Sequence, residues 1–90
     1  MAYQIFYHPE VRNDISRFPQ NIKDRIQRAI ENRLIVDPVK YGSPLKRSLQ
    51  RYWKLRVGDY RVIYKIDGEN IKILTIGHRK DVYRFVPNRG

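Results

Sequence analysis

The chain has 90 residues, and its 19 Lys and Arg against 9 Asp and Glu give a formal net charge of +10 at pH 7. This length suffices for one compact domain with one core, so residues 1–90 are expected to form a single domain. Because the chain lacks cysteine and any metal-type Cys/His spacing, we expect no disulfide, structural metal or cofactor.

The positive charge is concentrated in the second half of the chain. Residues 1–45 carry a net charge of +2, whereas residues 46–90 carry +8. Such a domain attracts polyanions: nucleic acid, an acidic protein or a membrane surface. A membrane is disfavoured, because neither predicted helix has a broad basic amphipathic face and no signal-like or long apolar segment is present. We therefore expect a soluble cytoplasmic protein.

The first half of the chain predicts one strand and two helices. The aromatic and β-branched run from Tyr3 to Tyr7 favours a strand. Pro9 suits the first turn of a helix whose apolar positions are Val11, Ile15 and Phe18, and Pro19 ends it. A longer amphipathic helix follows. Its apolar positions are Ile22, Ile26, Ala29, Ile30 and Leu34.

The second half predicts a loop followed by three strands. Pro38 stops the second helix at Asp37, and residues 37–50 are expected to form a loop. Gly58-Asp59 marks a tight hairpin turn between WKLRV and YRVIYKI, and Asp67-Gly68 marks a second turn before Ile71–Ile76. The predicted fold is α+β with the order β-α-α-β-β-β, an antiparallel sheet with two helices packed on one face.

A two-residue hairpin fixes which side chains share a face of this sheet. The predicted core face contains Trp53, Leu55, Val57, Tyr60, Val62, Tyr64 and Ile66, continued by Ile71, Ile73 and Thr75. The opposite face, here called the basic face, contains Tyr52, Lys54, Arg56, Arg61, Ile63 and Lys65, continued by Lys72 and His78. Arg56 lies opposite Arg61, and this repulsion predicts an anionic ligand.

A charged face on a small sheet is most often solvated surface, but three details favour a binding site. The strands of the basic face carry no carboxylate there, cations oppose one another across the hairpin, and the face leads to Gly77, where the last strand is interrupted. Tyr52 and Tyr83 lie off the core face, so they are candidates for base stacking or proton transfer.

Two segments, KLRVGDYRVIYKID and IKILTIGHRKDVY, closely resemble the RelE branch of the RelE/ParE superfamily of bacterial and archaeal toxins. The resemblance extends over essentially the whole chain. It implies a toxin neutralised by a cognate RelB-like antitoxin. RelE-like members bind the ribosomal A site and cut mRNA there, as mRNA interferases, whereas ParE-like members poison DNA gyrase without being nucleases. One departure is Tyr52, where RelE has a lysine.

The resemblance implies a metal-independent endoribonuclease in which the 2′-OH attacks the adjacent phosphate to give a 2′,3′-cyclic phosphate. Its implied catalytic residues are Lys54, Arg61, Arg79 and Tyr83. Tyr83 is the expected general base, with Lys54 as the rival; Arg61 would hold the non-bridging oxygens and Arg79 would serve the leaving 5′-oxygen. The residues expected to bind mRNA or rRNA are Lys46, Arg47, Arg51, Tyr52, Arg56, Lys65, Lys72 and His78. A gyrase inhibitor and a plain nucleic-acid-binding module remain as alternatives.

Overall fold

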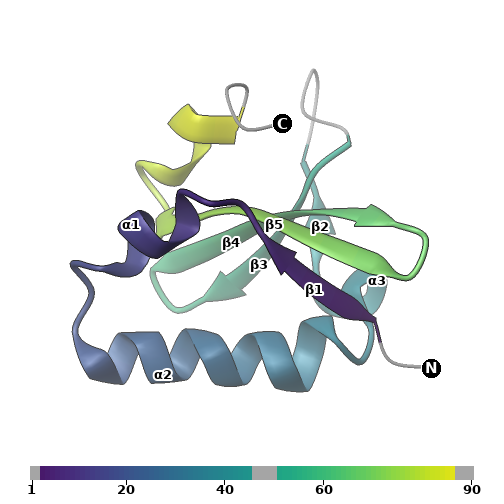
Figure 1. Ribbon diagram of the computed structural model, residues 1–90, viewed down its shortest axis with the longest axis horizontal. Coiled ribbons are helices and arrows are strands. Elements are labelled where there is room, and N and C mark those ends of the chain that lie inside the picture. Colours follow the sequence, from purple (N-terminus) through teal and green to yellow (C-terminus); the bar gives the residue numbers. More distant parts are fainter. Residues whose placement is uncertain (1–2, 46–50, 87–90) are drawn as a thin grey trace.

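The computed structural model describes residues 3–45 and 51–86 and contains one five-stranded sheet in the order β1-β5-β4-β3-β2 (Figure 1). The strands are β1 (Gln4–Tyr7), β2 (Ser43–Pro44), β3 (Trp53–Val57), β4 (Tyr60–Asp67) and β5 (Asn70–His78). The predicted α+β class is confirmed, and the two predicted turns join β3 to β4 and β4 to β5. Gly58 and Gly68 both have φ of 60°, a backbone conformation that favours glycine.

The two predicted helices are both present, but the first is shorter than its apolar spacing suggests. They are α1 (Val11–Ile15) and α2 (Gln20–Ala29), and α2 continues as the π-helical segment η1 (Ile30–Leu34). Helix α1 begins after Pro9 and ends before Phe18. The Phe18 ring instead packs on Tyr60 from the turn before α2, with ring centroids 4.8 Å apart. None of the helices in the described part of the chain is long and apolar enough to cross a membrane.

The predicted loop over residues 37–50 contains regular structure. Helix α3 (Pro38–Tyr41) begins where the Asp37 side chain accepts a hydrogen bond from the Lys40 backbone at 3.0 Å, and β2 then pairs with β3. A loop was expected because Pro38 ends the preceding helix, yet proline also suits the first turn of a new helix. Residues 46–50, which include Lys46 and Arg47, lie outside the described residues.

Strand β1 runs parallel to β5, so the sheet is mixed. The pairs β5–β4 and β4–β3 are antiparallel, as predicted, and β2, which was not predicted, pairs antiparallel with β3. The parallel direction of β1 differs from the predicted antiparallel sheet and has a topological cause. Two helices separate β1 from the hairpins, so no tight turn fixes its direction, and a connection of this length permits parallel pairing.

Apolar clusters lie on both faces of the sheet. Helix α2 covers one face, and a short helix, η3 (Val82–Phe85), lies over the other (Figure 1). The larger cluster joins α2 and η1 to the core face, where Leu55, Val62 and Tyr64 are almost fully buried. The smaller cluster lies on the basic face and consists of Leu45, Ile63, Val82 and Val86.

The hairpin register is confirmed for β3 and β4 but changes along β5. Arg56 pairs with Arg61, as predicted, and Lys65 and Lys72, both expected on the basic face, pair with each other. A bulge at Leu74 then shifts the pairing, so that Thr75 lies opposite Ile63 and His78 lies opposite Tyr60. Such an extra residue exchanges the two faces for every later position.

The assignment of Thr75 to the core face and of His78 to the basic face was therefore wrong. Ile76 takes the core position instead, and the His78 ring meets Tyr60 edge-on at a centroid distance of 6.0 Å. The Thr75 hydroxyl donates to the Asp14 carboxylate of α1 at 3.0 Å, and the Ile76 backbone N–H donates to the same oxygen at 3.3 Å. The bulge thus directs this end of β5 toward α1.

Candidate nucleic-acid interface

The paired arginines lie at the turn end of the β3–β4 hairpin and have different environments. Arg56 is exposed on β3, whereas Arg61 on β4 is only 9% exposed. Gly77 pairs with Arg61 on the other side, and a Cβ built there would lie 3.5 Å from the Val82 side chain. Val82 of η3 therefore packs directly over Gly77, next to Arg61.

The guanidinium of Arg61 is fixed by its own hairpin. Its Nη1 donates to the Gly58 carbonyl and to the Tyr60 carbonyl, both at 2.9 Å. These two bonds hold the planar group in one orientation and leave Nε and Nη2 as further donors. Among the described residues, no carboxylate forms an ion pair with Arg61 within 4 Å, so its positive charge is not neutralised locally.

Lys54 and Tyr83 are both placed close to Ile63. Lys54 is partly exposed on β3 and pairs directly with Ile63, which is fully buried. Tyr83 is partly exposed on η3 and packs against the cluster that contains Ile63 and Val82. The middle of the basic face is therefore covered by η3 and is less open than a solvated sheet face. The structure brings both candidate bases to this covered centre.

The GHRKDVY segment forms a turn that is attached to the first hairpin. The backbone N–H of Arg79 donates to the Asp59 carbonyl at 2.9 Å, and the Lys80 N–H donates to His78 Nδ1 at 3.2 Å. The Arg79 side chain itself is exposed. This attachment brings the turn that carries Arg79 to the hairpin that contains Arg61.

A second row of basic-face residues crosses the opposite end of the sheet. Lys65 pairs with Lys72, and Lys72 pairs with Phe6 of β1. The Lys65 Nζ lies 5.7 Å from the centre of the Tyr52 ring, and Lys72 forms an exposed 3.7 Å ion pair with Asp67. Tyr52 also packs against the smaller cluster, so its ring is less free to stack on a base than predicted. Arg51, next to it, is exposed.

Phe6 is a candidate that the sequence interpretation missed. Its side chain is 49% exposed beside Lys72, and together with Lys65 it lines a pocket of about 360 Å³. Exposed aromatic rings next to cations are typical of single-stranded nucleic-acid sites. The chain sequence carried no signal for this placement, because only the parallel pairing of β1 with β5 brings Phe6 to the basic face.

Comparison with known proteins identifies the class of this basic domain. A family model described as the ParE toxin of the type II toxin–antitoxin system, parDE, matches residues 5–83. Toxin RelG of Mycobacterium tuberculosis is 33% identical over 93% of this chain and 99% of the relative, and Toxin RelE of the same organism is 30% identical over 97% and 92%. A chain of the M. tuberculosis toxin–antitoxin complex RelBE2 superposes with a TM-score of 0.81 at 28% identity, covering 88% of this chain and 100% of that one.

These similarities define a small toxin of a type II toxin–antitoxin system. The chain belongs to the RelE/ParE toxin superfamily, and its RelG and RelE relatives place it in the RelE-like branch.

Proposed function

We propose that the protein is a ribosome-dependent endoribonuclease that cuts mRNA in the ribosomal A site. The observation that carries this proposal is the convergence of Arg61, the Arg79 turn, Lys54 and Tyr83 around the part of the basic face covered by η3. The similarity to toxins named RelE and RelG supports the nuclease branch. Its proposed site of action is the cytoplasm, where ribosomes are found.

The proposed chemistry needs a base, positive charge around a phosphorane and support for the leaving oxygen. Tyr83, or its rival Lys54, would take the proton of the 2′-OH that attacks the adjacent phosphorus. The fixed guanidinium of Arg61 would stabilise the non-bridging oxygens through the donors that its backbone contacts leave free. Arg79 would stabilise the leaving 5′-oxygen. The products are a 2′,3′-cyclic phosphate and a free 5′-OH, and no metal ion takes part in this scheme.

The ribosome would supply the alignment that the domain lacks. Cleavage by the free domain is therefore expected to be slow, and holding mRNA in a reactive geometry lowers the barrier through orientation. The exposed cations outside the catalytic group are proposed to bind RNA phosphates. They include Arg51, Arg56, Lys65 and Lys72, with Lys46 and Arg47 from the undescribed segment.

The proposed protein partner is a RelB-like antitoxin. The structurally similar RelBE2 chain is taken from a toxin–antitoxin complex, and the archaeal RelE–RelB complex from Pyrococcus horikoshii OT3 contains another chain of the same fold at 27% identity. An acidic or amphipathic antitoxin segment would complement the net charge of +10.

The nuclease proposal predicts that Tyr83→Phe reduces A-site cleavage by at least about 100-fold, the lower range for loss of a general base. Its stability should change by less than about 0.5 kcal/mol, because the phenyl ring keeps its apolar contacts. Mapping the 5′ ends of an mRNA on programmed ribosomes, beside a ribosome-free reaction, measures the effect. Tyr41→Phe, at an exposed tyrosine on α3, is the matched control.

The same experiment with Lys54→Met decides between the two bases. Full activity of Tyr83→Phe together with loss in Lys54→Met would transfer the role to Lys54. Intact mRNA with the wild-type protein, when that protein is folded and binds its antitoxin, would contradict the nuclease proposal itself.

Inhibition of DNA gyrase is the second candidate function, because the matching family model is that of the ParE toxin. A gyrase inhibitor would not need the combination of Lys54, Arg61, Arg79 and Tyr83. Supercoiling assays with purified gyrase separate the two functions. Inhibition that survives Tyr83→Phe, without cleavage of mRNA on ribosomes, would favour the ParE-like activity.

A further inference from the structure

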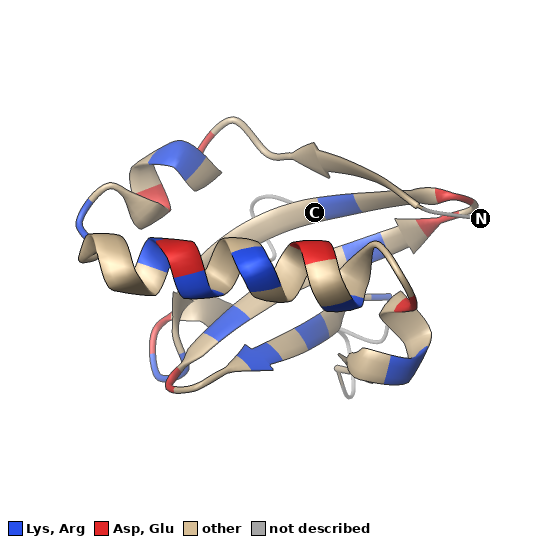
Figure 2. Cartoon of the chain, turned by 90° about the horizontal axis from the view of Figure 1, so that it is seen from below, with Lys and Arg blue, Asp and Glu red and all other residues tan. Residues whose placement is uncertain are grey.

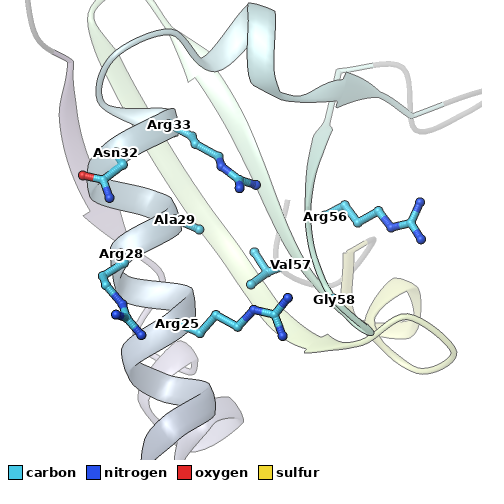
Figure 3. A pocket seen from close by; sticks show the side chains of 8 residues that line it. All are labelled: Arg25, Arg28, Ala29, Asn32, Arg33, Arg56, Val57 and Gly58. Atoms are coloured by element: carbon cyan, nitrogen blue, oxygen red, sulfur yellow. The ribbon is translucent and has the colours of Figure 1, made fainter.

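A pocket of about 220 Å³ lies at the edge of the sheet between α2 and β3 (Figure 3). Ala29 and Val57 contribute small apolar surfaces to it. The side chains of Arg25 and Arg33 extend from α2 and η1 toward β3, and Arg28 lies at the rim (Figure 3). Arg56 also lines the pocket, but its guanidinium points away from the helix (Figure 3). We call this pocket the arginine notch. It lies on the α2 side of β3, away from the covered centre of the basic face.

The charge of the notch is not neutralised by the described residues. No carboxylate lines it, and the two ion pairs formed within 4 Å in residues 3–45 and 51–86 are Lys72–Asp67 and Arg84–Asp81. The acidic residues of α2 and η1 are engaged elsewhere. Asp24 accepts from Gln20 and Glu31 accepts from Gln27, each at 2.9 Å. Acidic and basic positions are interspersed along the helix (Figure 2). Asp24 and Glu31 share a surface with Gln27 and Arg28, whereas Arg25 and Arg33 extend toward the strand (Figure 3).

The notch is continuous with the candidate catalytic site through Gly58. A Cβ at Gly58 would lie 3.2 Å from Arg25 Nη1, so Arg25 lies against the hairpin turn. The carbonyl of the same Gly58 accepts the hydrogen bond from Arg61. Arg56, which pairs with Arg61 on the basic face, also lines the notch. A polyanion bound at Arg61 could therefore continue around the open end of β3 and into the notch.

We propose that the arginine notch binds backbone phosphates of the RNA strand that leaves the candidate catalytic site. Arg25 and Arg33 are eight residues apart, which is about 12 Å along a helix. They can therefore hold two separate phosphates of one strand. Guanidinium groups suit this role because their planar donors match phosphate oxygens in bidentate pairs. The inference rests on the proposed function and adds a second contact region to it.

The test is RNA binding measured without cleavage. The probe is a short single-stranded 2′-O-methyl RNA with a fluorescent label, which lacks the attacking 2′-OH and therefore reports binding alone. Its affinity for the wild-type protein and for an Arg25→Ala/Arg33→Ala variant is measured by anisotropy between about 50 and 200 mM salt. The control, Arg12→Ala/Arg17→Ala, removes the same charge at two exposed arginines outside the notch.

A plot of log affinity against log salt concentration has a negative slope. Loss of two phosphate contacts should make this slope shallower by about 1.4, because each contact with a single strand contributes about 0.7. Over a fourfold rise in salt, the wild-type protein should then lose about sevenfold more affinity than the notch variant. The control should keep the wild-type slope, and an Arg25→Lys/Arg33→Lys variant should keep most of it because the charges remain. Thermal melting of each variant checks that it is folded.

Three results would overturn the proposal. The first is a notch variant that keeps the wild-type salt slope. The second is an equal change of the salt slope in the notch variant and in the charge-matched control. The third is a notch variant that binds RNA normally but no longer binds the antitoxin. The last result would assign the notch to an acidic protein segment. Because the probe cannot be cleaved, failure of the nuclease proposal would appear only in the ribosome assay and would leave this measurement intact.

Discussion

Arg61 combines a structural and a proposed catalytic role in one side chain. Its Nη1 donates to two backbone carbonyls of the β3–β4 hairpin, and the residue is buried. A guanidinium held in this way loses little further freedom when it binds a phosphate. The hairpin thus orients in advance the donor that the transition state needs.

This dual role predicts that Arg61→Ala lowers the free energy of unfolding by about 1 to 3 kcal/mol as well as reducing cleavage, because two carbonyls lose their donor. Arg79→Ala should also reduce cleavage but change stability by less than about 0.5 kcal/mol, since its side chain is exposed. Urea unfolding beside the ribosome assay measures both quantities. An Arg61→Ala protein as stable as the wild type would show that the hairpin does not depend on these bonds.

At the scale of elements, α3 is attached to the sheet through Tyr64. The fully buried hydroxyl of Tyr64 on β4 donates to the Pro38 carbonyl at 2.7 Å. A Cβ at Gly42 would overlap this hydroxyl, so glycine is required where the chain leaves α3. Burial also raises the pKa of Tyr64 well above its usual value of 10.0. Burial, together with the nearby Glu31 carboxylate, raises the pKa of Tyr7 as well.

The raised pKa of Tyr64 predicts a loss of stability in alkaline solution. The folded state keeps this proton above pH 10 while the unfolded state releases it, so the stabilisation is complete below about pH 10 and falls as pH rises. The decrease is about 1.4 kcal/mol per pH unit. The Tyr64→Phe variant should not show this pH-dependent decrease. At about pH 9 its free energy of unfolding should be about 1 kcal/mol below that of the wild type, because the hydrogen bond to Pro38 is lost.

Urea unfolding of both proteins at about pH 9 and about pH 11 checks this prediction, because the other titrating groups are common to both and their effects cancel in the difference. Equal pH dependence of the two proteins would contradict it.

On the scale of the whole molecule, the two faces of the sheet have different tasks. The larger cluster against α2 stabilises the domain, and the smaller cluster under η3 holds Tyr83 near Ile63. The charge is not confined to one face, since the arginine notch on the α2 side adjoins the basic face at the turn end of β3, and the Lys65–Lys72 row lies at the other end of the basic face.

This division predicts that Val82→Ala reduces cleavage by at least about tenfold, because a small displacement of η3 moves Tyr83 away from the reacting group. Ile26→Val, in the larger cluster, should cost about 0.5 to 1.5 kcal/mol and leave cleavage nearly unchanged. Both variants are assayed on ribosomes at a temperature at which unfolding curves show that each is folded. Equal losses of activity would indicate that stability alone governs the effect.

The sequence by itself determined the α+β class, the two tight hairpins and the pairing of Arg56 with Arg61. These features depend on local signals: glycine at the turns, alternation of side chains along a strand, and apolar spacing along a helix. The candidate residues Lys54, Arg61, Arg79 and Tyr83 also came from the sequence, through its resemblance to a known family. Their catalytic roles stay predictions.

Only the tertiary structure decided the direction of β1, the bulge at Leu74 and the position of η3. The bulge moves His78 to the Tyr60 side, parallel pairing brings Phe6 beside Lys72, and packing of η3 covers Ile63. Arg25 becomes part of a notch only because α2 lies along β3. Each of these depends on contacts between residues far apart in the chain, which no local pattern of side chains specifies.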